Sequence, residues 1–265
     1  MSTNRPQVCN HKVRNRKEPQ RRLWSVQCLT LLLLAALGCV SAAAQSVAYV
    51  PTHKSNSVAV INTASNSVID VIPVGIQPLS GAMSPNGQEV YVTNSGWIFG
   101  SNSVSVINTL TNTVVATIPV GNFPIGVAFT PNGAFAYVVN SNANSVSVID
   151  TATRTVVSTI NVGASPWGVA FTPSGAFAYV TNQSTNDVSV IDTDPTSPTF
   201  HTVVATVPVG AFPWNLAFTP DGTQAYVANY NSSNVSVIDT TATPPTVVNT
   251  VPVGSGARGV AITPF

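Results

Sequence analysis

Cysteine and histidine are almost absent from the greater part of this chain. All three cysteines, Cys9, Cys28 and Cys39, lie within the first 39 of its 265 residues. Beyond residue 45 there is therefore no thiol that could form a disulfide, bind a metal or act as a nucleophile. Only two histidines, His53 and His201, follow residue 45.

Charged residues are also scarce, and they are unevenly distributed. Seven of the ten basic residues lie within the first 22 positions. The residues after position 44 carry eight acidic and three basic side chains, a net charge of −5. This part of the chain offers no basic patch for a phosphate backbone, so we do not expect a nucleic-acid partner.

The beginning of the chain has the three parts of a secretory signal peptide. After the basic start comes an apolar run, Leu29–Val40, and then the string SAAAQ with Ala42 and Ala44 at the usual spacing. The run is shorter than the roughly 20 apolar residues that span a bilayer. We therefore predict a signal peptide over residues 1–44, a mature chain without a membrane span, and a periplasmic, secreted or cell-surface location.

Two alternatives for export remain open. The string ALGC, which ends at Cys39, loosely resembles a lipoprotein box and would make Cys39 an acylated residue. The pair Arg21 and Arg22 could belong to a twin-arginine signal. A general secretory signal peptide is the simpler interpretation.

An internal repeat covers the whole chain after the leader. Its most regular marker is a Val-Gly pair, whose glycines are separated by 46, 42, 47 and 44 residues. Each of the five versions contains four short segments rich in Val, Ile, Tyr and Phe, which indicate β-strands. In the third version these segments are Gly126–Thr130, Ala136–Asn140, Ser145–Asp150 and Thr155–Val162.

Proline positions predict the order of the strands within each unit. A proline precedes the Val-Gly pair in the fourth segment of most units (Pro73, Pro119, Pro208 and Pro252). Proline cannot donate a ladder hydrogen bond and belongs on an edge strand. The fourth strand should thus be the outer edge, and the Gly-Val-Ala-Phe segment the innermost strand of a propeller blade.

These observations predict an all-β fold, a five-bladed β-propeller of four-stranded antiparallel blades over residues 45–265. The chain after the leader begins with a second-strand motif (SVAYV, 46–50) and ends with a first-strand motif (GVAIT, 259–263). We expect the ring to close by strand exchange, with the last strand joining the first three. Closure would leave no unpaired inner edge.

The motifs resemble a known family. YVTN stands at Tyr91–Asn94 and at Tyr179–Asn182, with YVVN at Tyr137 and YVAN at Tyr226. Together with the VSVIDT and PVG strings, they resemble the YVTN-family β-propeller repeat of secreted, periplasmic and surface-layer proteins, including YncE-like propellers. The resemblance implies a propeller fold and says little about function, because propellers host many unrelated activities.

No catalytic residues, metal site or cofactor site is predicted from the sequence. No phosphate loop, calcium loop, nucleophile elbow or haem attachment motif is present. We expect His53 and His201 to be exposed on opposite faces. The repeated strand-end residues should form turns by bonding their own backbone; they are Asn62, Asn108, Asp150, Asp192 and Asp239.

Large side chains in the loops suggest a contact site. The residue that opens each innermost strand is, in order, Leu79, Ile125, Trp167, Trp214 and Arg258. On the same face we expect His53 and Lys54, and a longer loop that exposes Trp97 and Phe99. Aromatic walls with few polar groups suit a small ligand, so the predicted ligand-binding residues are Trp167, Trp214, Arg258, His53, Lys54, Trp97 and Phe99. The alternative is that these side chains pack between blades.

The sequence favours a non-catalytic function. We expect an exported binding or scaffolding module that recognises a protein or a small anionic or sugar-like ligand on its loop face. Two alternatives are kept: a lactonase-like or other hydrolytic propeller enzyme, and a structural protein of the cell envelope.

Overall fold

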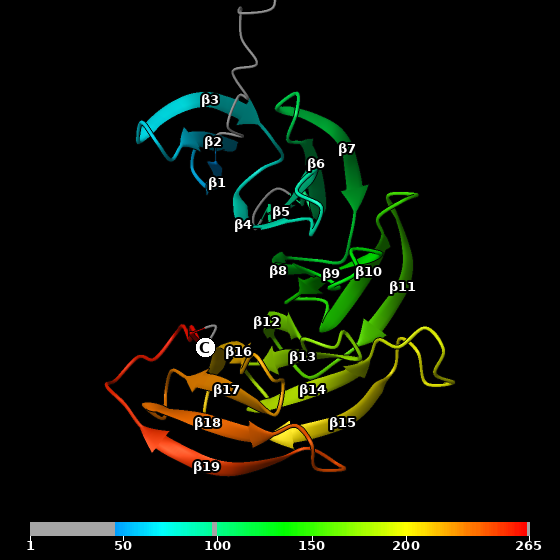
Figure 1. The fold of residues 1–265 in the computed structure, drawn as a ribbon, viewed down its shortest axis with the longest axis vertical. Helices are drawn as coiled ribbons and strands as arrows, with labels where there is room; N and C mark the ends of the chain where they lie inside the picture. Colours follow the sequence, from blue (N-terminus) through cyan, green and yellow to red (C-terminus); the bar gives the residue numbers. More distant parts are fainter. Residues whose placement is uncertain (1–45, 97–99, 264–265) are drawn as a thin grey trace, which may run out of the picture. The chain divides into compact units, whose positions relative to one another are not determined.

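The structure, a computed structural model, describes residues 46–96 and 100–263 (Figure 1). These residues form nineteen strands in five antiparallel sheets, one sheet for each sequence repeat. None of them belongs to a helix long and apolar enough to cross a membrane. The predicted signal peptide, residues 1–44, lies outside the described residues.

The first sheet has three strands and each of the others has four. The first sheet consists of β1 (Val47–Thr52), β2 (Ser57–Asn62) and β3 (Ser67–Pro73). The second consists of β4 (Pro78–Met83), β5 (Glu89–Asn94), β6 (Ser103–Asn108) and β7 (Thr113–Pro119). The third consists of β8 (Pro124–Phe129), β9 (Phe135–Asn140), β10 (Ser145–Asp150) and β11 (Thr155–Asn161). The fourth consists of β12 (Pro166–Phe171), β13 (Phe177–Asn182), β14 (Asp187–Asp192) and β15 (Val203–Pro208). The fifth consists of β16 (Pro213–Phe218), β17 (Gln224–Asn229), β18 (Asn234–Asp239) and β19 (Thr246–Pro252).

The strand order within each sheet confirms the order predicted from the prolines. Strands follow one another in chain order, as in β4-β5-β6-β7. The first strands of neighbouring four-stranded sheets pack together, β4 on β8, β8 on β12 and β12 on β16. The last strands of the sheets form the other edge, and all of them except β11 end in the predicted prolines. This arrangement is the propeller-like one expected from the repeat.

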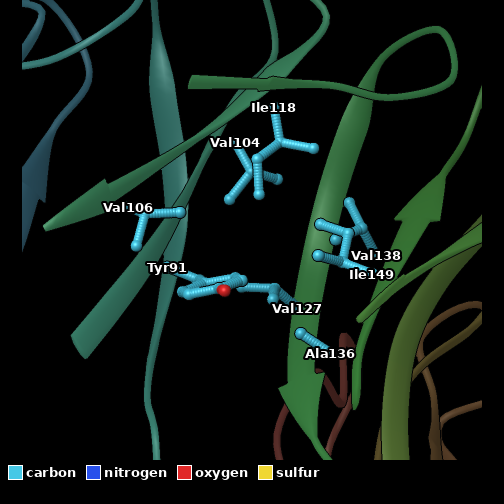
Figure 2. Packing of buried hydrophobic residues seen from close by; sticks show 8 residues of the cluster. All are labelled: Tyr91, Val104, Val106, Ile118, Val127, Ala136, Val138 and Ile149. Carbon is cyan, nitrogen blue, oxygen red and sulfur yellow. The ribbon is translucent and has the colours of Figure 1, made fainter. Parts of the chain in front are cut away.

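Apolar side chains fill the space between neighbouring sheets. Figure 2 shows the cluster between the second and third sheets, where the ring of Tyr91 lies near Val127 and Ala136. Tyr91 is fully buried and makes an edge-to-face contact with Phe129, with ring centroids 4.8 Å apart. Because one face of each sheet covers the next, each repeat depends on its neighbour for its core.

The repeated asparagine and glycine belong to one structural unit. Asn140, the last residue of β9, is fully buried, and its Nδ2 donates to the hydroxyls of Ser145 and Ser147 at 3.2 and 2.9 Å. A Cβ atom on Gly121 would lie 2.6 Å from the Cγ of Asn140. Gly75, Gly163 and Gly210 stand in the same relation to Asn94, Asn182 and Asn229. The asparagine side chain therefore explains four of the five Val-Gly pairs; a Cβ on Gly254 would meet nothing within 4 Å.

The predicted closure by strand exchange is not found. The first sheet remains three-stranded, and residues 257–263 form no strand. The segment follows the fifth sheet, and the first and fifth sheets do not pack together within residues 46–96 and 100–263. The prediction relied on motif counting, which does not determine how far apart the first and last sheets lie.

Candidate functional site

The two tryptophans predicted to bind ligand start equivalent inner strands. Phe212, which precedes Pro213, adopts a left-handed backbone conformation with φ of 58°. The Oδ1 of Asn186 accepts a hydrogen bond from its N–H at 2.9 Å. Such a conformation is unfavourable for a bulky residue, so this bond helps to fix the turn that delivers Trp214. The same arrangement precedes Trp167.

The strands that carry these tryptophans approach one another closely. A Cβ on Gly168 would lie 2.7 Å from the carbonyl oxygen of Trp214, so only glycine fits there without a shift. The hydroxyl of Thr181 donates to the same carbonyl at 2.6 Å and accepts the N–H of Gly168 at 2.9 Å. Thr181 thereby joins the fourth sheet to the fifth directly beneath the tryptophans.

The close approach stacks three aromatic rings. The rings of Trp167 and Trp214 have centroids 4.6 Å apart and an interplanar angle of 24°. Tyr230, which follows β17, stacks on Trp214: the two ring centroids are 5.8 Å apart and the interplanar angle is 22°. Aromatic pairs of this kind contribute about 0.5–1.5 kcal/mol beyond their buried area.

Arg258 completes the cluster. Its Cζ lies 4.4 Å from the ring centroid of Trp214 and 5.0 Å from that of Tyr230. Gly256, with φ of 76°, lets the backbone pass close to the Tyr230 ring. Arg258 is exposed. In the described part of the chain it belongs to no ion pair; the ion pair found there joins Arg154 and Glu89. The guanidinium therefore keeps donors for a ligand. We call Trp167, Trp214, Tyr230 and Arg258 the aromatic–arginine cluster.

The other predicted site residues do not join this cluster. His53 and Lys54 are exposed in the turn between β1 and β2. They were expected beside Arg258 because the last segment was expected to enter the first sheet. Residues 257–263 form no strand in the first sheet, and Arg258 lies on Trp214 instead. Trp97 and Phe99 lie outside the described residues. Tyr230 was missed because it follows the repeat motif YVAN directly and has no spacing signal of its own.

His201 is not the exposed residue that the sequence suggested. Its ring stacks on Phe200 with centroids 3.6 Å apart and makes edge contacts with Phe135 and Tyr137. Burial lowers the pKa of His201, and the nearby Asp192 carboxylate opposes that shift. Its Nε2 is buried and has no hydrogen-bond partner in the described part of the chain. The insertion between β14 and β15 thus places an uncharged imidazole against the rings of Phe135 and Tyr137.

The strand-end residues form turns, as predicted. The Oδ1 of Asp150 accepts the N–H of Thr153 at 2.8 Å, and the Oδ1 of Asp239 accepts the N–H of Thr241 at 2.9 Å. In Asp192, burial favours the neutral acid, but hydrogen bonds from Ser197 and Thr199 outweigh it and lower its pKa. These carboxylates are used within their own turns. The described residues contain no group of three or more His, Cys, Asp or Glu that could hold a metal.

Comparison with known proteins supports the fold and changes the functional interpretation. A model of the family described as lactonase, seven-bladed β-propeller, matches residues 127–258. No curated protein matches the chain. The match begins in β8 and ends at Arg258, so it contains all four members of the aromatic–arginine cluster.

Several solved structures share the fold. Hydrazine synthase of Kuenenia stuttgartiensis is 24% identical, with a TM-score of 0.71 over 83% of this chain and 68% of its own. Two proteins provisionally assigned as 6-phosphogluconolactonases are also similar. The one from Bacteroides fragilis is 16% identical, with a TM-score of 0.68 over 79% of this chain and 68% of its own. The one from Bacteroides uniformis is 17% identical, with a TM-score of 0.67 over 82% and 71%.

The expectation of a non-catalytic module, and with it the expectation that the protein is not an enzyme, is wrong. The lactonase family match and the 6-phosphogluconolactonase-like structures point to a hydrolytic lactonase-type propeller. The sequence had kept that function as an alternative. It was ranked lower because no cluster of acids and no metal ligands were visible, and a propeller loop site can be built from residues without such a motif.

Proposed function

We propose that this protein is a lactonase-type propeller hydrolase that binds an anionic, sugar-like lactone on the aromatic–arginine cluster. The observation that carries the proposal is the lactonase family match over residues 127–258, which spans the cluster from Trp167 to Arg258. The similarity to 6-phosphogluconolactonase-like structures supports the same reaction class.

The chemistry of the cluster suits such a substrate. A sugar-derived lactone has a ring that can pack against aromatic side chains such as Trp167 and Trp214. A phosphate or carboxylate on that ring would accept hydrogen bonds from the guanidinium of Arg258, whose planar donors match these groups. In a region with few positive charges, this cation is the natural anchor for an anion.

Lactone hydrolysis also generates negative charge where a cation can act. Water attacks the lactone carbonyl, the ring C–O bond breaks, and a hydroxy acid forms with release of a proton at neutral pH. A cation near the carbonyl would stabilise the oxyanion of the intermediate. We assign to Arg258 the binding of the anionic group of the substrate, and to the two tryptophans the packing against its ring.

We further propose that the chain is a YVTN-type repeat propeller with five blades, one for each sheet. The buried asparagines that end β5, β9, β13 and β17 support this, since each has the same role in its repeat. The family model that matches has seven blades, so five blades would distinguish this chain from that family.

We also propose that the protein is exported, with the leader removed after Ala44. The basic start, the apolar run and the small residues before Gln45 support this. The intact mass of protein recovered from the envelope or medium should begin at or near Gln45. Recovery of a form that retains an acylated Cys39 would instead identify a lipoprotein.

Hydrolysis can be followed directly as proton release. The protein is incubated with glucono-δ-lactone, its 6-phosphate and a simple γ-lactone, and the base needed to hold pH 7 is recorded. We expect release above the spontaneous rate for at least the phosphorylated substrate. A protein that leaves all three spontaneous rates unchanged would contradict the proposal.

A further inference from the structure

Within residues 46–96 and 100–263, the first sheet alone lacks an inner strand, so β1 is paired on one side only, whereas β5, β9, β13 and β17 are paired on both. In the four-stranded sheets, the strand equivalent to β1 pairs with an inner strand. Val138 of β9, for example, lies opposite Val127 of β8 and is fully buried. The equivalent residue of β1 is Val50, which is 41% exposed. Val138 packs in the core between the second and third sheets, so Val50 lacks both a paired inner strand and a sheet that covers this face.

The chain carries a segment that repeats the missing strand. Residues 259–263 read GVAIT, and residues 126–130, which overlap β8, read GVAFT. The pairing of β8 with β9 therefore predicts the register. Val260 should lie opposite Val50, as Val127 lies opposite Val138, and Ile262 opposite Ala48, as Phe129 lies opposite Ala136.

Pro51 does not block this pairing. It occupies the place of Val139 in β9, and in the third sheet the register is irregular at that point, between Pro124 and Val127. No regular ladder pair is therefore lost at this position. The side chain of Pro51 instead packs towards Gly81 of the second sheet.

The segment is held away from the first sheet of its own chain. Arg258, immediately before it, lies on Trp214 and Tyr230 of the fifth sheet. A further inner strand would have to pack on β16 at Asn215, which is exposed. At the equivalent positions of β4, β8 and β12, where one inner strand packs on the next, the side chain is smaller: Ser80, Gly126 and Gly168. The first and fifth sheets do not pack together in the described ranges.

We propose that residues 259–263 of a second copy of this chain add to β1 as its fourth strand, reciprocally in a two-fold dimer. In each copy the first sheet lacks an inner strand, and the segment 259–263 has the sequence of an inner strand but pairs with none in the described residues, so two copies can complete each other. An exposed strand edge is otherwise a template for uncontrolled association. The inference does not depend on the proposed enzymatic activity.

Paired cysteines test the proposal in the full chain. With Cys9, Cys28 and Cys39 replaced by serine, the introduced thiols are the only ones. Two single variants, Val50→Cys and Val260→Cys, are mixed in equal amounts and oxidised mildly. We expect a disulfide that joins one chain of each kind, identified by mass spectrometry. Replacing Val260→Cys by Ala261→Cys is the control, because its side chain points to the other face of the strand and should give at least fivefold less product.

Two results would overturn the proposal. One is a double variant, Val50→Cys with Val260→Cys, that closes only within a single chain, which would mean that the ring closes on itself. The other is the absence of cross-linked product from both the mixture and the double variant. As an independent measurement, the unmodified chain should have the mass of a dimer by light scattering, and deletion of residues 259–265 should leave a monomer. A monomeric full chain would also contradict the proposal.

Discussion

Arg258 and Trp214 are in direct contact: the Cζ of Arg258 lies 4.4 Å from the centroid of the indole ring. This contact joins the last segment of the chain to the start of an inner strand, and Trp214 stacks in turn on Trp167. A cation–π contact at an exposed site contributes about 0.5–1 kcal/mol. The arrangement holds the guanidinium over an aromatic platform while its donors remain available.

Substitution of Gly163 by alanine should destabilise the protein. The new Cβ would lie 2.6 Å from the Cγ of Asn182 and 2.5 Å from the Oγ1 of Thr185. Overpacking of this kind costs about 1–3 kcal/mol, which urea unfolding measures as a lower midpoint. Gly254→Ala is the matched control, because a Cβ there meets nothing within 4 Å. Equal midpoints for the two variants would contradict the role given to the asparagine.

Thr181→Val should weaken the connection beneath the tryptophans. The substitution removes the hydroxyl that donates to the Trp214 carbonyl and accepts the Gly168 N–H. Valine occupies the equivalent place in the third sheet as Val139, so the shape is tolerated. We expect a loss of about 1–3 kcal/mol in the free energy of unfolding and a change in tryptophan emission. Val139→Ile, which removes no hydrogen bond, should leave the emission spectrum as it is.

His201 should make stability depend on pH. Burial lowers the pKa of His201, so the unfolded chain takes up a proton near pH 6.5 and the folded chain only at lower pH. The free energy of unfolding should therefore decrease as the pH falls from 7.5 to 5.5. His201→Phe keeps a ring against Phe200 and should reduce this decrease, measured as the difference in Tm between the two pH values. His53→Phe, in an exposed turn, should show the same difference in Tm as the wild type. The account fails if His201→Phe also shows the wild-type difference.

The strands and turns were predictable from the sequence because their causes are local. Residues such as Val, Ile, Tyr and Phe define β9 and β10, and Asp150 closes its turn through its own backbone. The edge position of the fourth strands followed from prolines such as Pro119. In each case the residue acts on its immediate neighbours, so the repeat pattern carries the information.

The remainder depended on distances that the pattern does not contain. The grouping of Trp167, Trp214 and Arg258 was predicted, but through a ring closure that the structure does not have; Arg258 reaches Trp214 because Gly256 lets its segment pass over Tyr230. His201 is half-buried because the insertion that carries it folds back onto Phe135. The enzymatic class was missed because no residue of the cluster belongs to a catalytic motif.

The most direct test of the proposed activity is the ratio of kcat/KM for 6-phosphoglucono-δ-lactone to that for glucono-δ-lactone, each corrected for spontaneous hydrolysis. A charge-assisted hydrogen bond contributes about 1.5–3 kcal/mol, which corresponds to a preference of roughly tenfold or more for the phosphorylated substrate. Arg258→Ala should abolish most of this preference. Arg154→Ala should leave this preference unchanged. Arg154 pairs with Glu89 and lies in the turn before the start of β11, whereas Trp167 follows the end of β11. A wild-type protein that hydrolyses neither lactone, or a ratio that Arg258→Ala leaves unchanged, would contradict the account.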